Sequence, residues 1–458
     1  MVEVEIIATE ELGDRSYVAH DGRTAVVVDP QRDIDRVQRS LEERSLTVAM
    51  VCETHRHNDY VTGGFALARA TGATYVVPAA EDIVADRRGV ADGDELAAGS
   101  LRVRVMATPG HTPGHCAYVI GEGDNAGAPA AFTGGSLLYG SVGRTDLSGA
   151  ARTEELTRAQ YRSARRLAAA LPGDTAIYPT HGFGSFCSAG AATGGHASTL
   201  SQERARNDAL TAGDEDGYVA RLIASLDAYP AYYAHMGALN RQGPAAPDLS
   251  PPEEASGEQV RKRIAAGEWV IDLRSRRAFA AGHLDGAVGV ELAQPFATYL
   301  GWLIPWGTPL TLIGENPDQI ARAQRQLVRI GIDRPVGATI APASQLADGH
   351  PLRAYPVVTF AGLAAARARG EDPAVLDVRT NTEWNRDHIR GAAHVPLYEL
   401  TASLGRLPSG RLWVHCGSGY RASIAASLLD RVGRKMVLID DDYSNAAPAG
   451  LQLTTDER

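Results

Sequence analysis

The sequence predicts a layered α/β protein with sheets inside and helices outside, built from one large part and two smaller, related parts. Short apolar strands alternate with helical patterns in both halves of the chain, which is typical of this class. A segment without periodicity, RQGPAAPDLSPPEEASGE at about 241–258, is rich in proline, alanine and acidic residues and indicates a linker. Beyond it, residues 375–397 repeat residues 270–292 without a gap. At roughly 100–200 residues per domain, the 458 residues fit about three domains.

The large first part contains short strands that are bounded by glycine, aspartate and proline. Between residues 4 and 120 the strand-like segments are SYVAH, TAVVVD, TVAMVCET and RVRVMATP. Helical periodicity follows in IDRVQRSLEER and over about 153–170 and 197–225. This mixture predicts sheets that are covered by helices.

The two smaller parts are copies of one domain. The segments VIDLRSRRAFAAGHLDGAVGVEL and VLDVRTNTEWNRDHIRGAAHVPL match at a constant offset of 105 residues (375 − 270). The coinciding residues are Val270/Val375, Asp272/Asp377, Arg274/Arg379, His283/His388, Gly286/Gly391 and Ala287/Ala392. A period this long indicates a duplicated domain rather than a solenoid unit. We expect the Asp-x-Arg residues to be structural and the His and Gly to belong to a turn.

Composition and charge argue against a nucleic-acid partner and a membrane span, and they indicate a compartment. The net charge is −10 and no basic patch stands out, which argues against a nucleic-acid partner. No apolar stretch reaches about 18 residues, so we expect no membrane span. The four cysteines show neither a disulfide pattern nor CxxC spacing, which fits a reducing compartment. With no signal-peptide pattern at the N-terminus, we expect a cytoplasmic protein.

Three histidine-bearing segments each follow an apolar strand in the first part. They are CETHRHNDYVTGG with His55 and His57, TPGHTPGH with His111, and PTHGFGSFC with His181. Loops at strand ends leave imidazoles free to converge, and neutral imidazole suits zinc and iron. The sequence therefore predicts a metal site at one edge of a sheet. His115, in the same segment as His111, is expected to be an ordinary core or surface residue rather than a ligand.

A thiol near the C-terminus lies between an apolar strand and a helical run. Cys416 opens the segment CGSGYR, and the helical pattern IAASLLDRVG follows. Backbone N–H groups of Gly417, Ser418, Gly419 and Tyr420 would cradle an anion there, and the helix dipole would favour the thiolate. Arg421 adds positive charge at the end of the loop. These features predict a nucleophile that holds sulfur as an anionic persulfide.

The first copy of the repeat has no such thiol. Where the cysteine loop should follow the strand LTLI, the sequence reads GENPDQ from Gly314 onward, which is acidic. Without a thiol this copy cannot carry sulfur. We expect it to act as a spacer or docking surface.

The motifs of residues 3–240 resemble the metallo-β-lactamase superfamily, most closely its glyoxalase II and persulfide dioxygenase branch. The loop at 412–422 and the segment LDVRTNTEWNRDHIRGAAHVPL resemble the rhodanese family. Four residues separate Cys416 from Arg421, as in the rhodanese loop, whereas five separate the cysteine and arginine of tyrosine phosphatases. The resemblance implies an αβ/βα metallo-β-lactamase sandwich at 1–245, a degenerate rhodanese-like domain at 256–345 and a catalytic rhodanese domain at 352–458. This order of domains resembles that of the fusion proteins that oxidise persulfides.

The resemblance also implies roles for single residues. His55 and His111 match the family's iron ligands, and His57 matches a ligand of the first site in binuclear relatives. Asp59 and His181 match second-site ligands. Cys187 lies in a loop that borders the substrate site in the fusion enzymes, and it is either a reactive thiol or a small buried core residue.

Two departures from the family pattern bear on the metal site. HxHxDH has become HxHxDY, so Tyr60 stands where a second-site ligand would be, which weakens a binuclear site. The aspartate of the family's FTGD is Gly135 here, and it would complete the two-His-one-carboxylate triad. One hypothesis is that His55, His57 and His111 still hold one metal ion, with the sulfur of an anionic persulfide as the negative ligand. The other is that the domain has become a binding module or scaffold.

The preferred function is a persulfide dioxygenase and sulfurtransferase that oxidises persulfide sulfur to sulfite. The expected cofactor is one Fe(II) per chain, with zinc as the alternative. The expected partners are a small-molecule thiol persulfide, sulfite or thiosulfate, and a second copy of the chain in a homo-oligomer. Two alternatives remain open: a sulfurtransferase with a metal-deficient first domain, and a glyoxalase II-type thioester hydrolase.

Overall fold

The protein is described by a computed structural model that covers residues 2–123, 128–190, 195 and 197–455. The chain forms two compact units. The first contains residues 1–248 together with 325–333, and the second contains residues 249–324 together with 334–458. Each unit is described by itself.

The first unit contains two six-stranded sheets. The first sheet has its strands in chain order: β1 (Glu3–Thr9), β2 (Asp14–His20), β3 (Thr24–Val28), β4 (Thr47–Cys52), β5 (Thr74–Pro78) and β6 (Arg88–Val90). The second sheet has the order β12-β11-β10-β9-β8-β7, with β7 (Glu95–Ala98), β8 (Leu101–Ala107), β9 (Cys116–Glu122), β10 (Ala130–Gly134), β11 (Ala176–Pro179) and β12 (Ser198–Thr199).

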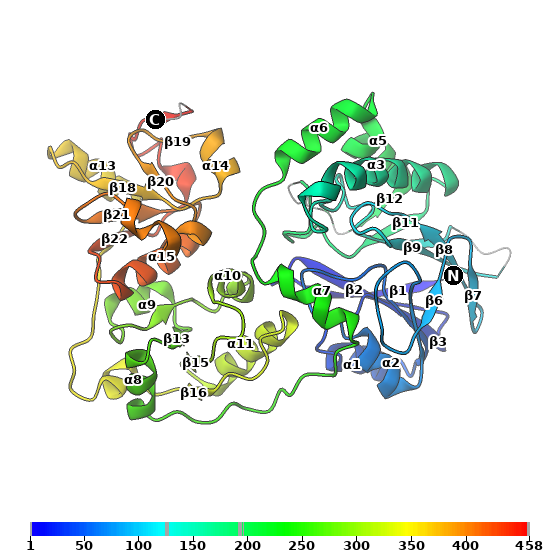
Figure 1. The fold of residues 1–458 in the computed structure, drawn as a ribbon, viewed down its shortest axis with the longest axis horizontal. Coiled ribbons are helices and arrows are strands. Elements are labelled where there is room, and N and C mark those ends of the chain that lie inside the picture. Colours follow the sequence, from blue (N-terminus) through cyan, green and yellow to red (C-terminus); the bar gives the residue numbers. More distant parts are fainter. Residues whose placement is uncertain (1, 124–127, 191–194, 196, 456–458) are drawn as a thin grey trace. The chain divides into compact units, whose positions relative to one another are not determined.

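The two sheets pack face to face with helices on both outer faces, as Figure 1 shows. Buried apolar residues from both sheets, among them Tyr17, Tyr118 and Phe132, form one cluster. The outer face of the first sheet packs on α1 (Asp35–Glu43) and α2 (Gly64–Thr71). The helices of the other outer region and of the end of the unit are η1 (Ala150–Arg152), α3 (Thr153–Ala170), α4 (Leu200–Arg206), α5 (Asp208–Thr211), α6 (Glu215–Ser225) and α7 (Tyr233–Arg241). The predicted αβ/βα sandwich is confirmed.

The second unit contains two parallel sheets, one from each copy of the repeat. The elements of the first copy are α8 (Gly257–Ala265), β13 (Trp269–Asp272), α9 (Arg276–Ala281), β14 (Val288–Gly289), α10 (Phe296–Leu303), β15 (Leu310–Ile313), α11 (Pro317–Arg329), β16 (Gly337–Thr339) and α12 (Ala343–Ala347). Those of the second copy are β17 (Val357–Val358), α13 (Phe360–Ala368), β18 (Ala374–Asp377), α14 (Asn381–Arg386), β19 (His388–Ile389), β20 (Ala393–His394), η2 (Leu397–Glu399), η3 (Thr401–Arg406), β21 (Leu412–His415), α15 (Tyr420–Arg431), β22 (Met436–Ile439), η4 (Tyr443–Asn445) and β23 (Leu453–Thr454).

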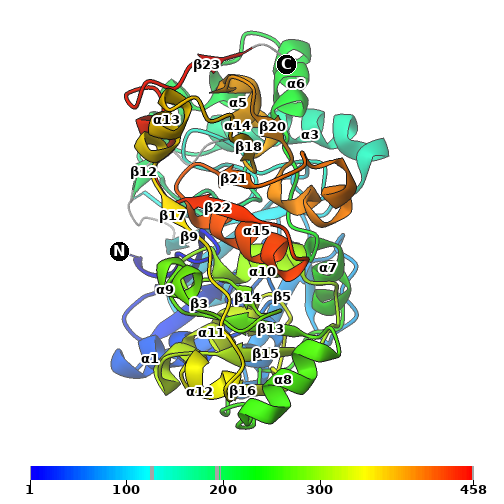
Figure 2. The same ribbon diagram turned by 90° about the vertical axis from the view of Figure 1, so that its left-hand side faces the viewer.

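The two copies share one topology. The first sheet has the order β14-β13-β15-β16, and the second has the order β20-β18-β21-β22-β17 (Figure 2). The bridge between Glu254 and Ala338 in the first copy occupies the place of the β17–β22 pair. The segments that repeat in the sequence therefore take corresponding places in the two sheets.

Side-chain contacts repeat as well, and they explain the Asp-x-Arg pattern. Arg274 donates to both carboxylate oxygens of Asp272, and Arg379 does the same to Asp377. Each arginine also donates to a backbone carbonyl eight residues onward, of Gly282 in the first copy. These pairs tie the end of a central strand to the turn that follows the next helix, which is the structural role expected.

In the part of the chain that the structure describes, no helix has both the length and the apolar character needed to cross a membrane.

Candidate functional site

The histidines of the first unit converge from three strand ends. His55 and His57 follow β4, His111 follows β8, and His181 follows β11. The ring centroids of His55 lie 4.1 Å from His57, 4.8 Å from His111 and 5.3 Å from His181. All four side chains are buried. Because the strands end at one edge of the sandwich, loops far apart in the sequence deliver imidazoles to one place.

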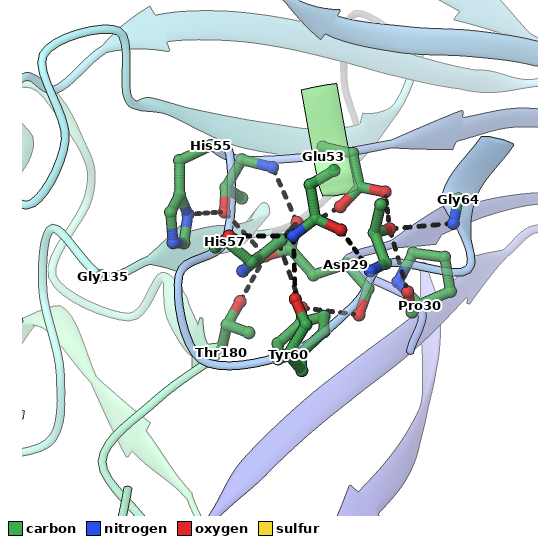
Figure 3. Close-up of polar contacts among 12 residues, drawn as sticks. Asp29, Pro30, Glu53, His55, His57, Tyr60, Gly64, Gly135 and Thr180 are labelled. Carbon is green, nitrogen blue, oxygen red and sulfur yellow. Dashed lines mark hydrogen bonds and ion pairs between the residues drawn. The ribbon is translucent and has the colours of Figure 1, made fainter. Parts of the chain in front are cut away.

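One ring nitrogen of His57 contacts two carboxylates, and the other has no hydrogen-bond partner among the described residues. As Figure 3 shows, Nε2 lies 3.1 Å from Glu53 Oε2 and 3.3 Å from Asp29 Oδ1. Burial opposes protonation of His57, but Asp29 and Glu53 outweigh it and raise the pKa to about 10. Nδ1 is buried and has no hydrogen-bond partner among the described residues. A carboxylate that holds one nitrogen of a metal-binding histidine is the usual support for its other nitrogen as a ligand.

Tyr60 supports the same ring. Its hydroxyl lies 3.1 Å from His57 Nε2, and its ring stacks on the imidazole at 4.3 Å between centroids. Tyr60 is fully buried. Its hydroxyl therefore lies at the Nε2 atom of the ring and leaves Nδ1 without a hydrogen-bond partner among the described residues.

His55 is also fixed as a lone-pair donor. Its Nδ1 lies 2.8 Å from the Thr54 hydroxyl, which in turn donates to Asp29 at 2.7 Å. Nδ1–H of His55 must therefore donate to Thr54, and Nε2 carries the lone pair. That Nε2 lies 3.3 Å from Nε2 of His181. Two nitrogen ligands of one tetrahedral ion, with bonds of about 2.0–2.1 Å, lie about 3.3 Å apart.

His181 is oriented by two carboxylates. Its Nδ1 lies 2.9 Å from Asp14 Oδ1 and 3.0 Å from Asp59 Oδ2. Burial disfavours the charged ring, yet Asp59 and Asp14 raise the pKa of His181 to about 9. Burial and the charge of Asp59 raise the pKa of Asp14 to about 7. The acids turn Nε2 of His181 toward His55, so His181 lies nearer the centre than the sequence predicts.

His111 lies between two glycines. Its Nδ1 donates to the Arg144 carbonyl at 2.7 Å, and its Nε2 is buried without a hydrogen-bond partner among the described residues. A Cβ atom on Gly135 would lie 2.3 Å from Cδ2 of His111, and one on Gly143 would lie 2.6 Å from Nδ1. The imidazole therefore fills the space into which the side chain of the family's aspartate would extend.

This packing makes a prediction for Gly135→Ala. The added methyl group forces the His111 ring to shift, so we expect metal affinity to fall at least about tenfold and stability to fall by about 1–3 kcal/mol. Metal content and thermal unfolding of the first unit measure both effects. Gly213→Ala is the matched control, because its Cβ would meet open space. Equal metal binding by both variants would contradict the packing described.

The donor set fits a metal ion. Ligand atoms of His55, His57 and His181 lie within 4.8 Å of one another, and so do those of His111, His181 and Cys187. Burial lowers the pKa of His111 to about 3 and holds that of His55 far below its ordinary value, so both rings are neutral. Neutral imidazoles with buried lone pairs are the ligands that zinc and Fe(II) take.

His115 has a structural role, as expected. Its Nδ1 lies 2.8 Å from the Thr108 hydroxyl, and its Nε2 accepts from the Gly135 N–H at 3.0 Å. With both nitrogens bonded, neither is available to a metal.

The thiol loop of the second unit lies where the sequence predicts it. Cys416 follows β21 directly, and α15 begins at Tyr420. Gly419 has a φ of 85°, and a Cβ there would lie 2.3 Å from the Asp440 carboxylate, so only glycine fits. Cys416 is buried.

Arg421 is paired within the protein. Its guanidinium donates to both carboxylate oxygens of Glu383 at 2.5 and 2.7 Å. This pair lowers the pKa of Glu383 to about 2 against the opposing effect of burial. The arginine is thus held in one orientation, and its charge is partly balanced.

The cysteine-free copy contributes to the wall beside this loop. A pocket next to Arg421 is lined by Tyr299 and Trp302 of α10, and Trp302 stacks on Tyr398 at 4.8 Å between centroids. Tyr420 donates from its hydroxyl to the Glu291 carbonyl at 2.8 Å. The first copy is therefore more than a spacer, since its aromatic side chains bound the pocket of the second.

Sequence reasoning missed the acids and the arginine that orient the histidines: Asp14, Asp29, Glu53 and Arg144. Asp29 and Glu53 carried a signal, because each directly follows a buried strand, as the histidine segments do. Asp29 also has a φ of 50°, which is uncommon outside glycine. Asp14 and Arg144 reach the site through contacts more than thirty residues away, which no local pattern reveals.

Comparison with known proteins identifies two domain families in the chain. The family model described as Metallo-beta-lactamase superfamily matches residues 12–181, and that described as Rhodanese-like domain matches residues 361–447. A crystal structure of a metallo-beta-lactamase from Staphylococcus aureus is similar with a TM-score of 0.66 and 25% sequence identity, covering 74% of this chain and 98% of that chain.

Two curated relatives match the first unit. A hydroxyacylglutathione hydrolase of Brucella anthropi is 32% identical over 249 residues, which cover 53% of this chain and 89% of that protein. The human mitochondrial persulfide dioxygenase ETHE1 is 32% identical over 208 residues, which cover 45% of this chain and 72% of that protein. The chain therefore belongs to the metallo-β-lactamase superfamily, in the group that includes persulfide dioxygenases and hydroxyacylglutathione hydrolases, and it carries a rhodanese-like domain fused behind that fold.

Proposed function

We propose that the chain is an enzyme of sulfur metabolism that joins a persulfide dioxygenase to a sulfurtransferase. The main support for this proposal is that one chain contains both a buried histidine cluster and a thiol just before a helix. The similarity to a persulfide dioxygenase and to rhodanese-like domains supports sulfur as the common element.

The residues of the first site would hold and orient a metal ion. His55 and His111 would present neutral ring nitrogens, His181 would present the Nε2 that faces His55, and His57 would add Nδ1 while Glu53 and Asp29 hold its other nitrogen. When bound, Fe(II) supplies the redox chemistry that lets O2 react with a substrate sulfur. The histidines of the site are buried.

The overall reaction consumes a thiol persulfide, O2 and water: RSSH + O2 + H2O gives RSH + H2SO3. The terminal sulfur is oxidised to sulfite, O2 is reduced, and the S–S bond breaks so that the carrier thiol leaves with a proton. A persulfide is anionic and soft, which suits a site whose protein ligands are largely neutral.

The second site would use the sulfite. Cys416 as a persulfide transfers its outer sulfur to sulfite: Cys–S–SH + SO3²⁻ gives Cys–SH + S2O3²⁻. Arg421 is fixed by Glu383, and a Cβ atom on Gly417 of the loop would lie 3.1 Å from its guanidinium, so this charge lies beside the loop that would hold the outer sulfur. Two sites in one chain raise the effective concentration of the shared sulfite.

The domain boundaries at 1–245, 256–345 and 352–458 belong to the same proposal. The shared strand order of the two copies supports a degenerate rhodanese-like domain at 256–345. The four cysteines are free, which supports a cytoplasmic setting. A homo-oligomer stays a prediction.

The test uses the full chain loaded with Fe(II) under anaerobic conditions and then exposed to air with glutathione persulfide. We expect the O2 consumed to equal the sum of the sulfite and the thiosulfate formed. The competing thioester hydrolase is tested with S-lactoylglutathione in the same sample. Thioester cleavage without O2 uptake would refute the proposal, and it would assign the site to hydrolysis by metal-bound hydroxide.

A further inference from the structure

The histidine cluster faces an electrostatic difficulty. A divalent cation held only by neutral imidazoles keeps its double charge in a buried place, which is costly without an anionic partner. Gly135 has no side chain to supply one, and His111 fills the space that a side chain would take. A negative ligand bound directly to the metal ion would therefore have to come from a residue other than Gly135.

The carboxylates nearest to His181 contact its outer side, and one oxygen of each, Asp14 Oδ2 and Asp59 Oδ1, has no hydrogen-bond partner among the described residues. Asp14 and Asp59 both contact Nδ1 of His181, which is the nitrogen that points away from His55. Among the described residues, Cys187 is the cysteine that lies close to histidine nitrogens. Its sulfur lies within 4.8 Å of ligand atoms of both His111 and His181. Cys187 is fully buried.

One residue positions both His111 and Cys187. The Arg144 carbonyl accepts from Nδ1 of His111 at 2.7 Å, and the Arg144 N–H donates to the Cys187 carbonyl at 2.8 Å. Arg144 is itself anchored, because its guanidinium bonds Asp146 at 2.7 and 2.8 Å and the Phe186 carbonyl at 3.1 Å. A fixed Arg144 therefore ties the His111 ring to the backbone of Cys187.

The loop of Cys187 is tied down independently. The Cys187 N–H donates to the Ser185 hydroxyl at 3.2 Å, and Ser188 forms a β-bridge with Gly143. Gly143 is also one of the two glycines that enclose His111. The buried, unpartnered Nε2 of His111 is a second sign of a ligand, since it offers a lone pair to the same cluster.

We propose that the Cys187 sulfur is the anionic ligand of the metal ion held by His111 and His181, in place of the carboxylate that Gly135 lacks. On binding, the S–H bond breaks, a metal–sulfur bond forms and the proton passes to solvent. The inference rests on the metal site of the proposed function. It shifts the ligand set toward softer metals, because thiolate favours zinc over Fe(II) more than a carboxylate does.

The test is cobalt substitution in the metal-free full chain. Titration with Co2+ should give d–d bands together with a near-ultraviolet sulfur-to-cobalt charge-transfer band. Cys187→Ser should lose the charge-transfer band, and its cobalt affinity should fall at least about tenfold. Cys187→Asp should regain affinity without the band. Cys416→Ser is the control that removes the other reactive thiol, and it should keep the band.

The outcomes separate this inference from the proposed function. Bound cobalt in the wild-type chain without a charge-transfer band would overturn the thiolate ligand and leave the histidine site standing. Failure of the wild-type chain to bind cobalt at all would overturn both. X-ray absorption of the zinc-loaded wild-type chain gives a second reading that needs no variant, and a spectrum with nitrogen and oxygen scatterers alone would contradict the inference.

Discussion

Cys416→Ser is expected to abolish the transfer of sulfur from thiosulfate to cyanide. The thiol is the nucleophile that the proposal places between β21 and α15, and a serine hydroxyl cannot hold a sulfur atom as a persulfide. We expect kcat/KM to fall by at least about a thousandfold. The measurement is thiocyanate formation under steady-state conditions, with metal content recorded on the same sample.

The control for this variant is another buried thiol. Cys116→Ser changes a cysteine at the start of β9, and its sulfur lies 3.8 Å from the Gly114 carbonyl rather than in a loop before a helix. It should keep sulfur transfer. Transfer that survives Cys416→Ser at the wild-type rate would show that another group carries the sulfur.

His111→Ala is expected to empty the metal site. The substitution removes a buried lone pair and leaves a gap between Gly135 and Gly143. We expect bound metal to fall to below about a tenth of the wild-type content. Mutation of a residue that only supports a ligand already lowers metal affinity by about 10–100-fold, and His111 is expected to be a ligand itself. Persulfide-dependent O2 uptake should vanish with the metal, while sulfur transfer at Cys416 should remain.

A second buried histidine provides the comparison. His20 ends β2, at the opposite end of that strand from Asp14, and it belongs to none of the described ligand groups. His20→Gln should therefore keep both metal and O2 uptake. Loss of metal in both variants would indicate that the unit unfolds, and retention in both would contradict His111 as a ligand.

Much of the fold could be predicted because its signals are local. Strand-sized apolar runs bounded by glycine and aspartate marked the sheets, and a gapless repeat marked the two copies. The pairing of α10 with the second copy could not be predicted, because FATYLGWL is apolar around its whole circumference. Such a helix must be buried, but its sequence does not say which partner covers each side.

The metal site was predictable only in part. Histidines at strand ends stand out in the sequence, but β4 lies in one sheet and β8 and β11 lie in the other, so the meeting of loops from both sheets at one edge became visible only in the structure. The place of His181 depends on Asp14, which lies 167 residues away in the chain, and no spacing rule links the two. The lost carboxylate at Gly135 was visible in the sequence, but its consequence for the packing of His111 required the structure.

The central claim is that this histidine cluster supports metal-dependent persulfide oxidation although Gly135 stands where the family has a carboxylate. The most direct test is to titrate the anaerobic, metal-free full chain with Fe(II) and to record O2 uptake with glutathione persulfide at each addition. The account predicts a rate that rises linearly and stops rising at one iron per chain. A rate that stays at the background level while thiosulfate-to-cyanide transfer is intact would contradict it, and the first unit would then be a scaffold for a sulfurtransferase.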